Sequence, residues 1–450
     1  MPTQNEDKYG STADPASSLA PHASFRRNLG TSEAFSIIIN IVIGSGLFTS
    51  LGAIDTNVPS PGAALVVWFV GGILAWTVAA TMAELGAAIP GEGGVQQYLQ
   101  YIYSEAFGFL AAIVFVESIY SATGVTDQPD RTANKLISSL VLLVISMANS
   151  VSTQFSTRLN TFFLTTKFAA IAVTMVAGLG VVFYHLAGWD RDNSREPQDW
   201  LTRAWFGARN TVGLDGREME WQKLHGWESL GHYSDALYGA YAELSAPARQ
   251  LPLAIKTAVP LIILSFIAVN IAYYILLFWR VVSTTDSVAV TSFSHLLGPT
   301  FGAIAAGLIC LVVAGSLLGS SFVAGRIVVA AAYCNWLPAR VGSVSGRSTS
   351  TADAPINAIL FSTAGSIVYI FFGDFRVLAA FSGLCLLRPY KPMICVPVVF
   401  ALVSRCVVAC GAVFAPVQAV VLIGLWLVGL GLYSARRQWI GKGEAESSEQ

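Results

Sequence analysis

The chain is organised as long apolar runs separated by short polar stretches. A helix that crosses a lipid bilayer needs about 20 apolar residues, and nine of the runs reach or approach that length. We predict spanning helices over residues 34–55, 63–89, 134–151, 160–186, 257–281, 301–332, 356–373, 391–410 and 414–434. The pattern therefore predicts an all-α polytopic membrane protein embedded in the lipid bilayer.

Three further apolar segments are too short to span: 107–120, 234–244 and 375–387. At about 1.5 Å of rise per residue, the segment 234–244 reaches only about 17 Å. Lys and Arg near span ends prefer the cytosolic side, and most of the basic loops fall on one side only if the chain crosses twelve times. We therefore expect twelve spans, three of them truncated, with both termini in the cytosol.

This layout divides the chain into regions. Residues 1–33 and 435–450 are predicted to be cytosolic tails, the first of them disordered, on either side of a membrane domain over residues 34–434. The polar segment 188–232 is rich in tryptophan, and we expect it to form an extracellular cap that lies against the membrane interface.

Composition narrows the function. The chain is 54% hydrophobic and 12% charged with a net charge of −1, which does not favour nucleic acid binding. The six cysteines include no CxxC pair, so we expect no disulfide framework, no metal site and no disulfide-linked subunit. The five histidines are scattered and no motif of a nucleophile elbow, zinc protease or phosphate-binding loop occurs, so we expect no cofactor and no enzyme activity.

The first apolar run contains an unusual sequence, IVIGSGLFTS, at residues 41–50. Glycine costs about 1 kcal/mol in a helix relative to alanine, so Gly44-Ser45-Gly46 calls for an explanation. One interpretation is close packing of helices through small residues. The other is a deliberate break, whose free backbone groups would bind a ligand in the middle of the membrane.

A second candidate is Lys167, which lies within a long apolar run. A lysine at the bilayer centre costs about 2.5–3.5 kcal/mol on insertion scales, so it either reaches the interface with its ammonium or has a partner inside the protein.

Ser316, Ser320 and Ser321 in the run 301–332 are candidates to face a cavity, although serine also serves as a packing contact between membrane helices.

An ordered set of short motifs carries a family resemblance: AELGAAIPGEGGVQQYL (83–99), ELSAPARQLPLAI (243–255), GSLLGSSFVAGRIVVAAA (315–332), APINAIL (354–360), GDFRVL (373–378) and RPYKP (388–392). Together they resemble the L-type branch of the amino acid–polyamine–organocation superfamily, and the fungal methionine-permease-like members are the most similar. The resemblance covers about residues 28–434.

The resemblance implies two inverted repeats of five helices, here residues 34–187 and 233–387, followed by two helices over residues 391–434. Helices 1 and 6 of this fold are interrupted, and their exposed backbone binds the carboxylate and amine of an amino acid. Ile43, Gly44, Ser45 and Gly46 match the first break, and Tyr238 and Gly239 flank the second. Ser316 and Ser320 are expected to complete the substrate site.

Lys167 resembles a family lysine in helix 5 whose ammonium takes the place of a sodium ion, which leaves proton symport or exchange as the coupling mode. The implied function is sodium-independent transport of neutral amino acids, methionine among them, across the plasma membrane by alternating access.

The chain departs from the family pattern at three abrupt joins, 112/113, 240/241 and 384/385, where helices 3, 6 and 10 are shortened. Two alternatives therefore stay open: a non-transporting truncated or regulatory variant of such a permease, and a transporter of another small amine.

Overall fold

The protein is described by a computed structural model that contains side chains. The structure describes residues 31–44, 46–88, 95–102, 104–106, 108–109, 132–187, 200–212, 218–224, 228–234, 236–237, 252–285, 287–342, 354–372, 424, 427, 430–431 and 433–435.

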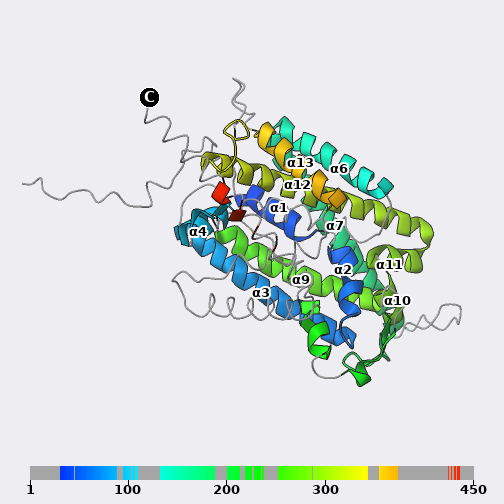
Figure 1. The fold of residues 1–450 in the computed structure, drawn as a ribbon. Coiled ribbons are helices and arrows are strands. Elements are labelled where there is room, and N and C mark those ends of the chain that lie inside the picture. Colours follow the sequence, from blue (N-terminus) through cyan, green and yellow to red (C-terminus); the bar gives the residue numbers. More distant parts are fainter. Residues whose placement is uncertain are drawn as a thin grey trace, which may run out of the picture.

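Helices make up almost all of this part of the chain (Figure 1). They are α1 (Thr31–Val42), α2 (Gly46–Asp55), α3 (Pro61–Ala88), α4 (Val95–Ile102), α6 (Thr132–Val151), α7 (Thr153–Leu186), α9 (Pro252–Leu276), α10 (Trp279–Thr284), α11 (Val288–Leu297), α12 (Pro299–Tyr333) and α13 (Ile356–Phe372). A short antiparallel pair, β1 (Thr211–Val212) and β2 (Glu218–Met219), and a 3₁₀ turn, η2 (Trp221–Lys223), lie between α7 and α9.

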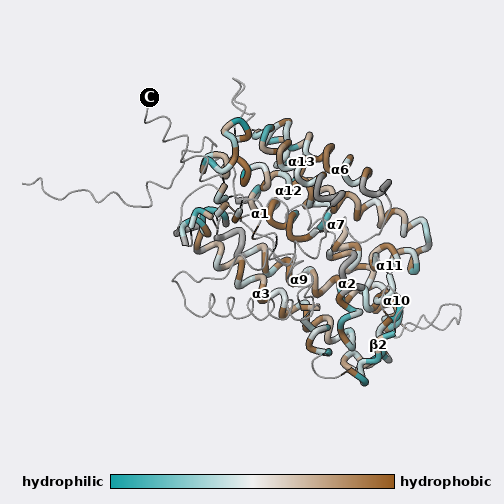
Figure 2. Tube along the Cα trace, in the orientation of Figure 1, coloured by the Kyte–Doolittle hydropathy of each residue, from teal (hydrophilic) through white to brown (hydrophobic). Residues whose placement is uncertain are grey.

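The helices follow the apolar runs of the sequence. Among the described residues, four helical stretches are long and apolar enough to cross a membrane: Pro61–Ala83, Thr153–Leu186, Thr257–Leu276 and Pro299–Tyr333. Hydrophobic stretches dominate the middle of the bundle, and hydrophilic stretches gather near α4 at one end and near β2 at the other (Figure 2). The predicted all-α membrane architecture is therefore confirmed.

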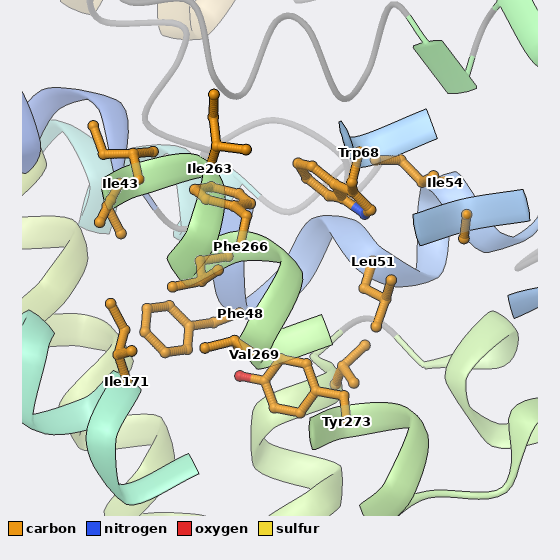
Figure 3. Packing of buried hydrophobic residues seen from close by; sticks show 14 of the residues in the cluster. Ile43, Phe48, Leu51, Ile54, Trp68, Ile171, Ile263, Phe266, Val269 and Tyr273 are labelled. Carbon is orange, nitrogen blue, oxygen red and sulfur yellow. The ribbon is translucent and has the colours of Figure 1, made fainter. Parts of the chain in front are cut away.

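Helix α1 occupies the centre of the bundle and packs against α7, α9 and α12 (Figure 1). Helix α2 continues it towards α10 and α11, and α3 packs along α9. The main hydrophobic core joins these helices, and Figure 3 shows Phe48 of α2 between Ile171 of α7 and Phe266 and Val269 of α9. Both halves of the first helix are thus fixed by buried apolar contacts.

Glycine permits a close approach between α7 and α12 at Gly315. A Cβ added at Gly315 would lie 2.5 Å from Cβ of Phe163. The backbones of α7 and α12 can therefore approach closely at this point because Gly315 has no side chain.

Residues 200–212, 218–224 and 228–234 lie in or just after the predicted cap segment 188–232 and fold over one end of the bundle (Figure 1); they are called the cap below. The cap hydrogen-bonds to the start of α3 and to the residues before it. The backbone carbonyl of Trp205 accepts from the Gly62 N–H at 2.7 Å, and the Arg209 N–H donates to the Pro59 carbonyl at 3.1 Å. These two hydrogen bonds hold the cap against the chain that follows α2.

Several predictions concern residues outside the described ones. The undescribed residues include nearly all of the short segments 107–120, 234–244 and 375–387. They also include the predicted span 391–410 and most of the predicted span 414–434. The twelve-span count, the truncation of three helices and the division into repeats stay predictions.

Candidate functional site

The first spanning segment is interrupted, as one of the two interpretations of its sequence predicts. Helix α1 ends at Val42 and α2 begins at Gly46. Ile43 and Gly44 lie between them and are buried, while Ser45 is outside the described residues. The Gly44 N–H donates to the Val42 carbonyl at 2.9 Å, a tight turn in place of a helical hydrogen bond.

Lys167 of α7 reaches this break from the side. Its side chain is fully buried, and Nζ donates to the backbone carbonyl of Asn40 at 2.6 Å and to that of Ile43. The interpretation in which Lys167 extends to the membrane interface does not fit this position. An ammonium at the carboxyl end of α1 is favourable, because the last carbonyls of a helix lack intrahelical donors and carry partial negative charge.

A pair of buried amides that the sequence analysis did not single out lies beside Lys167. Asn40 Nδ2 donates to the backbone carbonyl of Asn160 at 2.6 Å and to Asn160 Oδ1 at 3.1 Å. Asn160 Nδ2 in turn donates to the Ser156 carbonyl at 3.1 Å. Asn40 thus links α1 to α7 through its side chain, while its backbone carbonyl accepts a hydrogen bond from Lys167 Nζ. The only sequence signal was a lone amide within each of two apolar runs.

The predicted serines come from α12. Ser316 Oγ lies 3.5 Å from the Ile41 carbonyl, so Ser316 contacts α1 one residue before its end. Ser320 is buried one helical turn further along α12. The adjacent Gly319 packs tightly on Ile41, since an added Cβ would lie 2.9 Å from Ile41 Cγ1. The structure therefore brings Ile43, Lys167 and Ser316 together around the end of α1.

The second predicted half of the site, Tyr238 and Gly239, is outside the described residues. Within the described ranges, no group of three or more His, Cys, Asp or Glu side chains is placed to hold a metal ion. The described cysteines, Cys310 and Cys334, are free thiols.

The arrangement provides two different chemical ends at one buried point. The carboxyl end of α1 is occupied by a fixed ammonium, while α2 begins at Gly46 with first-turn N–H groups that have no intrahelical acceptor. The free N–H groups at a helix start bind anions, and a carboxylate is small enough to accept hydrogen bonds from them. A ligand with a small carboxylate is therefore chemically reasonable at the start of α2.

Comparison with known proteins shows which family this chain resembles. The model of the family described as amino acid permease matches residues 29–428, which is most of the chain. The match includes both halves of the broken helix, Lys167 and the serines of α12.

Curated relatives agree with the family match. The chain is 27% identical over 404 residues to the rat large neutral amino acids transporter small subunit 2, covering 84% of this chain and 72% of the relative. It is 27% identical over 425 residues to the human b(0,+)-type amino acid transporter 1, covering 85% and 82%. The mouse Asc-type amino acid transporter 1 is 26% identical over 366 residues, covering 78% and 66%. These relatives and the family are transporters, not enzymes, as the sequence predicted.

Proposed function

Because the chain belongs to the amino acid permease family, we propose that it is a secondary active transporter of neutral amino acids, methionine included, in the plasma membrane. The observation that carries the proposal is the buried break between α1 and α2, with the Lys167 ammonium on the carbonyls of Asn40 and Ile43. The rat relative is named for large neutral amino acids, which supports this substrate class.

In the proposed site, the N–H groups at the start of α2 and the backbone of residues 44–46 receive the substrate carboxylate. Lys167 fixes the end of α1, so that the two half-helices keep their offset when the ligand is absent. Ser316 and Ser320 complete the wall on the α12 side. The backbone N–H groups at the break distinguish the carboxylate from other groups of the substrate by hydrogen bonding. The neutral side chain of the substrate can therefore vary.

We infer sodium independence from the position of Lys167. Its ammonium donates to the carbonyls at the end of α1, which is the place where a bound metal ion would otherwise be needed. Uptake of labelled methionine should be unchanged when external sodium is replaced by N-methylglucamine. A dependence on an imposed pH gradient would identify proton symport, and a dependence on amino acid loaded on the other side would identify exchange.

The proposal is tested by a substitution at the break. Ser45→Val places a β-branched side chain where the backbone must stay open, and we expect it to abolish labelled methionine uptake at unchanged surface abundance. Ser32→Val is the matched control, because Ser32 is exposed at the start of α1. Unchanged substrate affinity in Ser45→Val would contradict a substrate site at the break.

The amine alternative makes a distinct prediction. A site that recognises a carboxylate should ignore polyamines and choline, so an excess of either should not compete with labelled methionine. Effective competition by amines that lack a carboxylate would favour the alternative substrate class.

The three joins at 112/113, 240/241 and 384/385 favour a second candidate function, a non-transporting variant that binds amino acids or partner chains. Full-length transcripts that carry extra coding segments at the joins would assign transport to a longer product of the gene. Dominant transcripts with these joins, together with substrate binding at the cell surface without uptake, would support the regulatory variant.

A further inference from the structure

Helix α2 has a second attachment at the end away from the break. Its last residue, Asp55, is fully buried although it carries a carboxylate. The hydroxyl of Tyr274 in α9 donates to Asp55 Oδ1 at 2.6 Å, across 219 positions of sequence. A buried polar group that loses its hydrogen-bond partner is costly, so this contact links α2 specifically to α9; it is called the tie below.

Charged and aromatic groups from neighbouring elements surround the tie. Arg203 and Arg209 of the cap are close enough for their charges to act on the Asp55 carboxylate. Arg203 Nη2 also donates to the Leu277 carbonyl at 3.1 Å just after α9, and the Arg209 guanidinium lies 4.9 Å from the centre of the Trp279 ring in α10. The two cations offset only part of the cost of burying the carboxylate.

The residues that follow Asp55 are bound by the cap as well. Thr211 Oγ1 donates to the Thr56 carbonyl at 3.3 Å, and Trp221 Nε1 donates to Thr211 Oγ1 at 2.9 Å. His232 Nδ1 and Asn57 Oδ1 are 2.9 Å apart. The cap is therefore hydrogen-bonded to the chain just beyond α2, while Tyr274 links α2 to the long helix α9.

We propose that Asp55 and Tyr274 are positioning residues for substrate binding, which act through α2. The proposal rests on the proposed function, because it assumes that the start of α2 meets the substrate. Ten residues of helix separate the two ends of α2 by about 15 Å. A rigid helix held at Asp55 fixes the direction and depth of the N–H groups at Gly46, where the ligand carboxylate binds.

Loss of the tie should weaken binding more than it slows turnover. Without the hydroxyl of Tyr274, α2 samples orientations in which its first N–H groups miss the carboxylate, and binding must select the correct one. A tenfold change in affinity corresponds to about 1.4 kcal/mol, which is a typical contribution of one buried hydrogen bond. We expect KM for methionine to rise about tenfold in Tyr274→Phe, with the maximal rate changed less than twofold.

The neighbouring tyrosine supplies a matched control. Tyr273 is equally buried (Figure 3), but its hydroxyl lies beside Thr174 of α7 and forms no hydrogen bond to the described residues of α2. Tyr273→Phe removes the same atom one residue away and should leave KM unchanged. Asp55→Asn keeps an oxygen that accepts from Tyr274, so it should raise KM less than Asp55→Ala does.

A second measurement does not depend on transport. Hydrogen–deuterium exchange on the purified protein in nanodiscs should show faster exchange of α2 amides in Tyr274→Phe than in wild type and in Tyr273→Phe. Equal α2 exchange in all three proteins, or KM values that Tyr273→Phe and Tyr274→Phe raise alike, would overturn the positioning role. Wild-type protein that takes up no amino acid would overturn the proposed function, while the exchange measurement would still test the tie.

Discussion

At the scale of single residues, the position of Lys167 matters most. A buried ammonium is costly unless it is hydrogen-bonded, and Lys167 meets this condition with two backbone carbonyls at the end of α1. Asn40 supplies one of these carbonyls, and its own amide is fixed to Asn160 on the helix that carries Lys167. The cation and its acceptors are therefore held by one small set of contacts between α1 and α7.

Removing this cation tests its role. Lys167→Ala leaves two buried carbonyls without a donor, at about 1–3 kcal/mol each, and we expect transport to fall below about a tenth of wild type while membrane insertion is preserved. Uptake of labelled methionine, divided by surface abundance, measures the effect. Thr165→Ala, an exposed position on the same helix, is the control. Normal uptake in Lys167→Ala would contradict a role in coupling.

At the scale of elements, the contact between α7 and α12 supports the site, because these helices present Lys167 and Ser316 to α1. An added Cβ at Gly315 would meet Phe163 at 2.5 Å, whereas one at Gly307 of the same helix would meet no atom within 4 Å. Gly315→Ala should therefore destabilise the protein by about 1–3 kcal/mol through overpacking, and Gly307→Ala should not. Thermal unfolding in detergent compares the two, and equal midpoints would contradict close packing at Gly315.

The sequence predicted most elements well because apolar run length decides where a membrane helix begins and ends. The runs 134–151, 301–332 and 356–373 correspond to α6, α12 and α13 within about two residues, and the break at Gly44 was visible as a local violation of helix propensity. The partners of Asn40 and Asp55 were not predictable in this way. They lie 120 and 219 positions away, and nothing in a local pattern specifies which polar side chains meet across helices.

At the scale of the whole molecule, we predict the orientation in the membrane from the distribution of basic residues. Polar stretches lie at both ends of the bundle (Figure 2), and the cap covers the end that is predicted to be extracellular. The opposite end holds the connection after α12, where Arg340 is exposed. If the orientation is correct, the tie at Asp55 faces the outside and the basic loops face the cytosol.

Cysteine labelling in intact cells checks this orientation. Lys223 is 79% exposed in the cap, so Lys223→Cys should react with a membrane-impermeant maleimide added outside. Arg340→Cys should react only after the membrane is permeabilised, because its loop is predicted to be cytosolic. The parent protein controls for native thiols, since Cys310 is exposed on α12. Labelling of Arg340→Cys but not Lys223→Cys in intact cells would show that the orientation is the reverse of the predicted one. The tie between Asp55 and Tyr274 would then act on access from the cytosol.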